Sequence, residues 1–278
     1  MEKNKQNKKA QTENLAYNIS FSLIKAFDEV ESKERCPLQF YKQYITKEYE
    51  TEPTEPMRMG QYLEYLFTGQ LPRSKEIPQP KTTKTGLSTD YQRIVEHKER
   101  WEDLVKHYKI TDIVPGIETV TLLDDKISVK TVEDVRCKVN GKESIIDIKC
   151  SGLIRDKWQE TGWEEIERKP KLYRQGFMYC YNYKKTTGIL PDFYFAVFSP
   201  KSDDYRLIQL DFVYDGAEEI IFEEIENKVR YTKEMIDSYI DMGFHGSKNY
   251  SHCKNCGIEN CAYRQFVANI EKITISKF

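Results

Sequence analysis

The segment ISVKTVEDVRCKVNGKESIIDIK, residues 127–149, decides the fold of this chain. Apolar and polar residues alternate along residues 127–139, which predicts a half-buried β-strand. Asn140-Gly141 then predicts a tight hairpin turn, because both residues readily adopt positive φ. A second strand is expected at residues 144–149. With another strand at residues 117–123, joined through Asp124-Asp125-Lys126, the pattern predicts a three-stranded antiparallel meander.

The regions on both sides of the meander have the apolar spacing of helices. Helices are expected at residues 20–44 (in two pieces), 57–67, 91–108, 171–185 and 216–242. Two more strands are expected at residues 192–198 and 205–212, a loop is expected at residues 71–89, and an irregular or partly helical insert is expected at residues 153–169. This order of elements predicts an α/β fold with a mixed sheet flanked by helices.

The composition is that of a globular chain without a membrane or export segment. Of 278 residues, 39% are hydrophobic and 13% are aromatic, which is enough for a buried core. The net charge of −2 implies that nucleic acid would have to bind at a local groove. No apolar run reaches transmembrane length, and the N-terminus lacks a signal-peptide apolar region. We therefore expect a cytoplasmic protein.

One domain is expected after a polar tail. Residues 1–16 are almost wholly polar and are expected to be disordered. Residues 17–278 are expected to form a single domain, divided into a helical part, a core that contains the meander, and a cysteine-rich part, at residues 17–116, 117–243 and 244–278.

The cysteines near the end of the chain have the spacing of metal ligands. Thiolates of a CKNC segment at residues 253–256, with Cys261, can hold one metal centre, which then needs a fourth ligand. Cys36 is the candidate, because Pro37 marks a helix start there rather than core filling. Seven cysteines without an export signal favour metal or free thiols over disulfides. Three cysteines are expected to take no part: Cys137, Cys150 and Cys180.

Asp147 and Lys149 are two residues apart on one strand, so their side chains share a face, while Ile146 and Ile148 pack on the other. This pair suits hydrolysis of a phosphodiester. The acid can hold a divalent cation, and the lysine can support the attacking water or the developing negative charge. An ion pair on a half-exposed strand is the plain alternative.

Asp134 lies on the preceding strand, and the hairpin turn folds it back toward Asp147. Two carboxylates beside one lysine repel each other unless a cation neutralises them, so the pair favours a metal site. A solvated acid near the hairpin remains the alternative, because Glu133 is adjacent and strand registers can slip by one residue.

Helices supply three more candidates. Gly60 is expected to let its helix approach the sheet closely, which would bring Glu64 toward the acids one turn later. Gln175 and Tyr179 are four residues apart and share a helix face, where they could contact a phosphate backbone or orient Lys149. An ordinary surface glutamate and a core tyrosine are the alternatives.

In chain order the motifs are Cys36-Pro37-Leu38-Gln39-Phe40-Tyr41, Gly60-x-x-x-Glu64, Asp134, Asp147-Ile148-Lys149, Gln175-x-x-x-Tyr179 and Cys253-x-x-Cys256-x-x-x-x-Cys261. This order resembles the PD-(D/E)xK nucleases of the RecB type, in particular the iron–sulfur branch that includes the AddB nuclease domain and the CRISPR-associated RecB-like exonucleases. The resemblance spans about residues 20–264. It implies a restriction-endonuclease-like α/β core with a mixed central β-sheet flanked by helices, whose N- and C-terminal helical parts are clasped by a four-cysteine metal site.

The resemblance also implies an activity. The implied activity is that of a Mg²⁺- or Mn²⁺-dependent DNA exonuclease, which acts on single-stranded or duplex ends in phage or bacterial recombination, replication or repair. Metal ligands would be Asp134, Asp147 and Glu64. Lys149 would be the catalytic lysine, and the assisting motif would be Gln175 with Tyr179. Glu64 stands where many RecB-like members carry histidine and where phage lambda-type exonucleases carry glutamate.

The cysteines would hold a [4Fe–4S] cluster as a structural staple: Cys36, Cys253, Cys256 and Cys261. Zinc is the rival, because an all-cysteine site suits either metal. The last cysteine gap is one residue shorter than is usual in this branch.

Two other functions remain open, a CRISPR-adaptation nuclease that processes DNA ends and a catalytically inactive scaffold that binds them. Asp134, Asp147 and Lys149 together favour catalysis, because a binding protein gains nothing from clustered acids near phosphates. DNA is the expected partner, with a recombination or CRISPR protein and a second copy of the chain as further candidates. The expected location is the cytoplasm of a bacterial or phage-infected cell, and no membrane contact is expected.

Overall fold

The computed structural model describes residues 17–72, 75–157, 162–164, 170–211, 216–246, 258 and 261. Two compact units can be separated within the chain. The first contains Met1–Phe21 and Pro53–Asn227, and the second contains Ser22–Glu52 and Lys228–Phe278. The single domain expected at residues 17–278 stays a prediction, and the expected tail at residues 1–16 lies outside the described residues.

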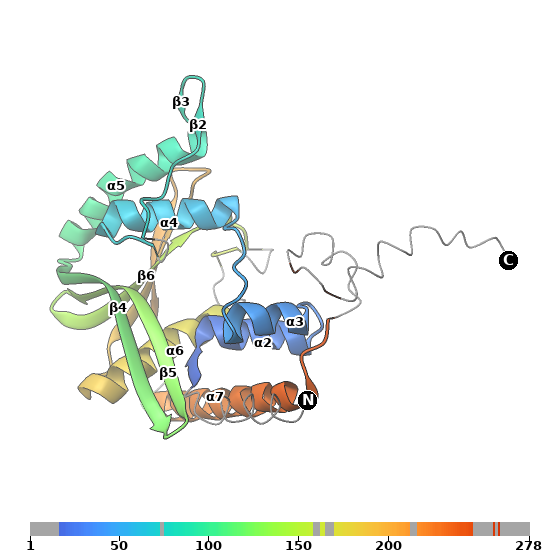
Figure 1. Cartoon of the computed structure of the whole chain (residues 1–278). Helices are drawn as coiled ribbons and strands as arrows, with labels where there is room; N and C mark the ends of the chain where they lie inside the picture. Colours follow the sequence, from blue (N-terminus) through green and yellow to red (C-terminus); the bar gives the residue numbers. More distant parts are fainter. Residues whose placement is uncertain are drawn as a thin grey trace, which may run out of the picture. The chain divides into compact units, whose positions relative to one another are not determined.

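A six-stranded mixed sheet forms the centre of the first unit (Figure 1). Its strands are β1 (Tyr17–Ser20), β4 (Thr111–Asp124), β5 (Ile127–Val139), β6 (Lys142–Cys150), β7 (Asp192–Phe198) and β8 (Tyr205–Leu210). Strands β1, β5, β6, β7 and β8 are neighbours in that order, and β4 also pairs with β5. The pairs β1–β5 and β6–β7 are parallel and the others are antiparallel. The predicted mixed sheet is confirmed.

The meander forms as the sequence predicts. Strands β5 and β6 are joined by Asn140 and Gly141, whose φ angles are 50° and 83°. Both are left-handed conformations that these two residue types tolerate best. The ladder then continues from Val139↔Lys142, which sets which residue of β5 faces each residue of β6.

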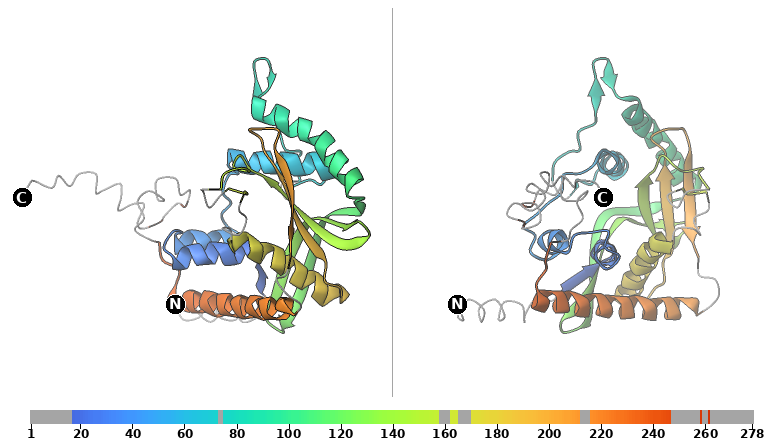
Figure 2. Two further views of the ribbon diagram at one scale, coloured as in Figure 1. Left: turned by 180° about the vertical axis from the view of Figure 1, so that it is seen from behind. Right: turned by 90° about the vertical axis from the view of Figure 1, so that its right-hand side faces the viewer.

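Helices cover both faces of the sheet in the first unit (Figures 1 and 2). They are α4 (Glu55–Thr68), α5 (Thr89–His107), α6 (Pro170–Thr187) and the first part of α7 (Ala217–Met242). Helices α4 and α5 share a core with Ile146 and Ile148 of β6. Helix α6 contacts Asp147 through Gln175. Because neighbouring side chains of a strand point to opposite faces, α6 lies on the face opposite α4 and α5.

Smaller elements complete the described structure. In the predicted loop at residues 71–89, β2 (Thr82–Thr83) and β3 (Gly86–Leu87) form a short hairpin that projects beyond α4 and α5 in both figures. The second unit contains most of α2 (Phe21–Glu31), α3 (Pro37–Phe40), the π-helix η1 (Tyr41–Ile45) and the rest of α7. None of the helices in the described ranges is long and apolar enough to cross a membrane.

The close approach of a helix to the sheet occurs at a different glycine from the one expected. The prediction for Gly60 is wrong, because a Cβ there would meet no atom within 4 Å. Helix α4 turns Met59 and Leu63 toward the core instead. At Gly176 of α6, a Cβ would lie 2.5 Å from Leu210 Cδ1 and 3.0 Å from the Phe193 ring.

Alanine substitutions at these two glycines should therefore have opposite effects. Gly60→Ala should raise the free energy of unfolding by about 0.5–1 kcal/mol, because alanine favours the helix and nothing obstructs its methyl group. Gly176→Ala should lower it by about 1–3 kcal/mol, because the buried Phe193 ring leaves no room. Urea unfolding measures both values. Equal effects of the two changes would contradict the assigned contact.

Candidate active site

Asp134 lies where β5 stops pairing with β6. The pairing runs from Val139↔Lys142 to Val135↔Ile146. Two residues further along β6, the Ile148 N–H donates to Asp134 Oδ2 at 2.8 Å. A carboxylate side chain thus takes the place of a strand partner, and this holds Asp134 beside the part of β6 that carries Asp147 and Lys149.

Asp147 is held from two elements. It is almost fully buried, and its Oδ1 accepts a hydrogen bond of 3.0 Å from Gln175 Nε2 on α6. Its Oδ2 lies in an ion pair with the Lys149 ammonium, and no hydrogen bond of normal geometry reaches that oxygen from the described residues. The same Gln175 amide is 3.3 Å from the Tyr179 hydroxyl. Helix α6 therefore holds one oxygen of Asp147, and the other faces Lys149.

The charges of this site act on one another. Burial and then the Asp147 charge raise the pKa of Asp134 well above its usual value, and Glu64 raises it further. The pKa of Glu64 on α4 is also raised, by burial and then by Asp147. Burial lowers the pKa of Lys149, but the carboxylates of Asp147 and Asp134 outweigh it and the net shift is upward. The site thus brings three carboxylates into electrostatic range of one ammonium.

The donor set fits a hard divalent cation. Carboxylate oxygens are the ligands that Mg²⁺ and Mn²⁺ prefer, and the Asp147 Oδ2 faces only the Lys149 ammonium among the described residues. Burial first, and the charge of Asp147 second, raise the pKa values of Asp134 and Glu64, and a bound cation would oppose both effects. In the described parts of the chain, no three His, Cys, Asp or Glu side chains are already arranged as a complete metal site. An ion would therefore have to draw these carboxylates together.

Tyr179 and Glu133 have well-defined surroundings. The Tyr179 ring is buried with its edge against Phe193, and burial, followed by the Asp147 charge, raises its pKa. It therefore stays a neutral phenol. Glu133, the alternative acid of the hairpin, is fully buried and paired with Arg136. Asp134 is therefore the acid that reaches β6, and nothing in the local sequence pattern distinguished it from Glu133.

The predicted cysteine site is described in part. Cys36 caps the N-terminus of α3, followed by Pro37, and is buried. Cys261 is buried with Ile258 and packs near Leu38 in the second unit. The predicted ligands Cys253 and Cys256 lie outside the described residues. The three remaining cysteines lie in the first unit, where burial raises the pKa of Cys137 and Cys150 to about 12 and also raises that of Cys180.

The chain shares its fold with a solved structure of a bacterial protein. That protein, from Eubacterium rectale, is described as a "Putative exonuclease"; the TM-score is 0.62 at 20% sequence identity, over 94% of this chain and 90% of that chain. Another solved structure, of SSO0001, has a TM-score of only 0.36 at 14% identity, over 77% of this chain and 76% of that chain. No family model and no curated protein matches the chain. The likeness shows the mixed α/β fold with its helix-flanked sheet.

The metal-free protein should become less stable as the pH rises above about 4, the pKa of the two carboxyl groups in the unfolded chain. The folded chain holds protons on Asp134 and Glu64 at pH values where the unfolded chain has released them, because both pKa values are raised by folding. The two carboxyl groups lower the free energy of unfolding once the pH exceeds their unfolded pKa of about 4, and the loss is complete above their folded pKa. Urea unfolding in EDTA, compared between wild type and Asp134→Asn, measures it. If the free energy of unfolding changes with pH in the same way in the wild type and in Asp134→Asn, the assigned charge of Asp134 is wrong.

Proposed function

We propose that this chain is a divalent-cation-dependent deoxyribonuclease that hydrolyses phosphodiester bonds at DNA ends. The observation that carries the proposal is the arrangement of Asp134, Asp147 and Lys149, with Gln175 and Glu64 on flanking helices. The resemblance of the motif order to RecB-type nucleases and the fold shared with the Eubacterium rectale protein support it.

Each residue would have a distinct task. A bound Mg²⁺ or Mn²⁺ would activate water and neutralise charge on the phosphate. Asp134 and Asp147 would hold the ion, with Glu64 as a third ligand. The Lys149 ammonium would stabilise the attacking hydroxide or the charge that develops on the phosphate. Gln175 orients Asp147 through its hydrogen bond to Oδ1. Tyr179, which stays protonated, would offer a hydroxyl beside that amide.

The second metal centre would be structural. We infer a [4Fe–4S] cluster, with zinc as the rival, on Cys36, Cys253, Cys256 and Cys261. The burial of Cys36 and the packing of Cys261 near Leu38 bring the two predicted ligand segments into one unit of the chain. Thiolates are suitable ligands for iron and zinc alike.

The biological setting would be processing of DNA ends in phage or bacterial recombination, replication or repair, or in CRISPR adaptation. With a net charge of −2, the chain would bind DNA through a local groove, and the affinity should fall steeply with added salt.

Digestion of end-labelled DNA tests the function. Linear duplex, linear single strand and covalently closed circles of one sequence are incubated with the protein and Mn²⁺, with EDTA as the control. We expect digestion of linear DNA and survival of the circles. Cleavage of circles would mean an endonuclease, and binding of ends without any digestion would show a scaffold protein.

A further inference from the structure

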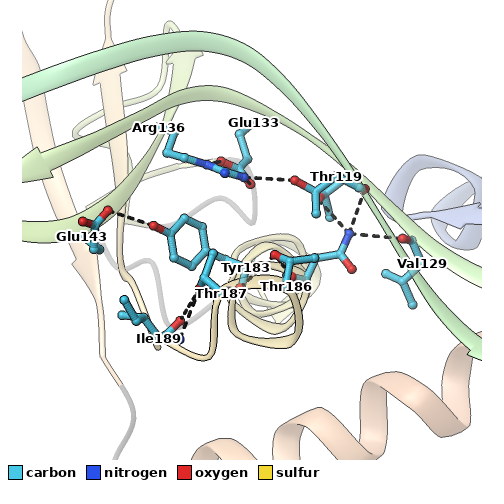
Figure 3. Close-up of polar contacts among 11 residues, drawn as sticks. Thr119, Val129, Glu133, Arg136, Glu143, Tyr183, Thr186, Thr187 and Ile189 are labelled. Carbon is cyan, nitrogen blue, oxygen red and sulfur yellow. Dashed lines mark hydrogen bonds and ion pairs between the residues drawn. The ribbon is translucent and has the colours of Figure 1, made fainter.

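An ion pair within β5 has a geometry that a flat strand does not permit. Glu133 and Arg136 are three residues apart, so in a regular strand their side chains leave opposite faces and their Cα atoms are about 10 Å apart. Yet Arg136 Nε and Nη2 donate to the two carboxylate oxygens of Glu133 at 2.8 and 2.7 Å (Figure 3). The alternation of side chains is therefore broken between Glu133 and Arg136, although the ladder to β4 keeps its register there, and we infer a local coiling of β5 at Asp134 and Val135.

Both members of the pair lie on the side of the sheet that α6 covers. The Arg136 guanidinium is 4.7 Å from the centre of the Tyr183 ring. Both Glu133 carboxylate oxygens accept hydrogen bonds from that guanidinium. Two side chains that should alternate thus share one face.

The local coiling coincides with the point where the site begins. Pairing of β5 with β6 ends at Val135↔Ile146, and the Asp134 carboxylate then reaches Ile148 N–H. A strand that continued flat would offer a backbone carbonyl to β6 rather than the side chain of Asp134. Asp134 thus becomes a side-chain acceptor next to Asp147 at the point where the alternation of β5 side chains is broken.

The pair is anchored on three sides. Glu133 is fully buried, and Arg136 Nη2 also donates to Thr119 Oγ1 on β4 at 3.0 Å. Tyr183, under the guanidinium, donates its hydroxyl to Glu143 on β6 at 2.8 Å. Asn182, next to it on α6, donates to the carbonyls of Thr119 and Val129. The pair is thus tied to β4, β6 and α6.

We propose that the Glu133–Arg136 pair is a positioning clip that holds the local coiling of β5 and so presents Asp134 to β6 and to the cation. Its role in ion binding rests on the proposed function, whereas its role in the local coiling does not. A bidentate guanidinium–carboxylate pair suits this task, because it fixes direction as well as distance.

The test separates positioning from stability. Arg136→Gln leaves Glu133 buried without a counter-charge and will destabilise the chain. The double substitution Glu133→Leu with Arg136→Met instead fills the same space with apolar groups, which often restores the stability lost with a buried ion pair. Lys130→Gln is the matched control, because it breaks the Lys130–Glu118 ion pair, which joins the same strand β5 to β4 away from Asp134.

Two readouts are measured on each protein. Amide hydrogen exchange by NMR, in metal-free protein, reports the Ile148 N–H that donates to Asp134. Titration calorimetry with Mn²⁺ alone, without DNA, reports the affinity for the ion. In the double variant we expect Ile148 exchange to be at least about tenfold faster than in wild type, relative to the amides of β7, and Mn²⁺ affinity to be about tenfold weaker. In the Arg136→Lys variant, the Ile148 exchange rate and the Mn²⁺ affinity should lie between the values of the wild type and those of the double variant.

If the Ile148 amide exchanges as slowly in a stable double variant as in the wild type, the proposed positioning role of the Glu133–Arg136 pair is wrong. The proposal is also wrong if the Lys130→Gln control loses as much Ile148 protection against hydrogen exchange, because the loss would then result from a general weakening of the strand. If the wild type takes up no Mn²⁺ and cleaves no DNA, the proposed function fails, but the Ile148 comparison still decides whether the pair holds Asp134 in place.

Discussion

Lys149→Met should reduce Mn²⁺-dependent DNA cleavage by about 10³-fold or more while the chain stays folded. The Lys149 ammonium is paired with the buried Asp147 and attracted by Asp134, and its raised pKa keeps it charged at neutral pH. Removal of that charge leaves the developing negative charge on the phosphate unstabilised. Asp147→Asn should have a loss of similar size, because the amide keeps the acceptor for Gln175 but gives up the charge that holds the cation.

Single-turnover cleavage of end-labelled linear DNA measures both losses. Lys142→Met is the matched control, since Lys142 is an exposed lysine at the start of the same strand, and its activity should equal that of wild type. Circular dichroism and urea unfolding verify that the variants are folded. Cleavage within about tenfold of wild type in Asp147→Asn would remove the carboxylate from the mechanism.

If the proposed cysteine centre is present, Cys261→Ser should lower the free energy of unfolding by on the order of 3–5 kcal/mol and abolish metal binding at that centre. A structural metal contributes its binding energy to folding, and four thiolates from residues 36 to 261 would close a loop that spans most of the chain. Cys36→Ser should behave in the same way, because the loss of any one thiolate opens the site.

Metal analysis and absorbance distinguish the possible centres. Iron with inorganic sulfide and a broad band near about 400 nm would indicate the iron–sulfur cluster, and stoichiometric zinc in a colourless protein would indicate its rival. Cys137→Ala is the control, since Cys137 belongs to the core of the first unit and should leave the metal content unchanged. A metal-free wild-type protein, as stable as Cys261→Ser, would refute the clasp.

Some elements could be predicted because their information is local. Strand β5 begins and ends at the predicted residues, 127 and 139, and the Asn140-Gly141 turn follows as expected. The pairing of β5 with β6 follows from that turn, since a tight hairpin sets the register of both strands. The shared face of Asp147 and Lys149 likewise follows from the two-residue period of a strand. Strand β1 was missed, because four residues at a sheet edge carry too short a pattern.

Contacts between elements that are distant in the sequence could not be predicted in this way. The sequence placed a glycine in each of α4 and α6, but only packing decided that Gly176, and not Gly60, meets the sheet. The choice between Glu133 and Asp134 was also open, because adjacent acids on a strand differ only in the face that they occupy.

By itself the sequence determined the elements, the hairpin register and the residue types of the site, since periodicity and turn chemistry act over a few residues. Only the tertiary structure decided that Gln175 reaches Asp147, that Asp134 accepts from the Ile148 N–H, and that Arg136 pairs with Glu133 on its own strand. The physical reason is that these contacts depend on where strands part and helices dock. Burial and side-chain packing of the whole unit set those positions, and no local pattern encodes them.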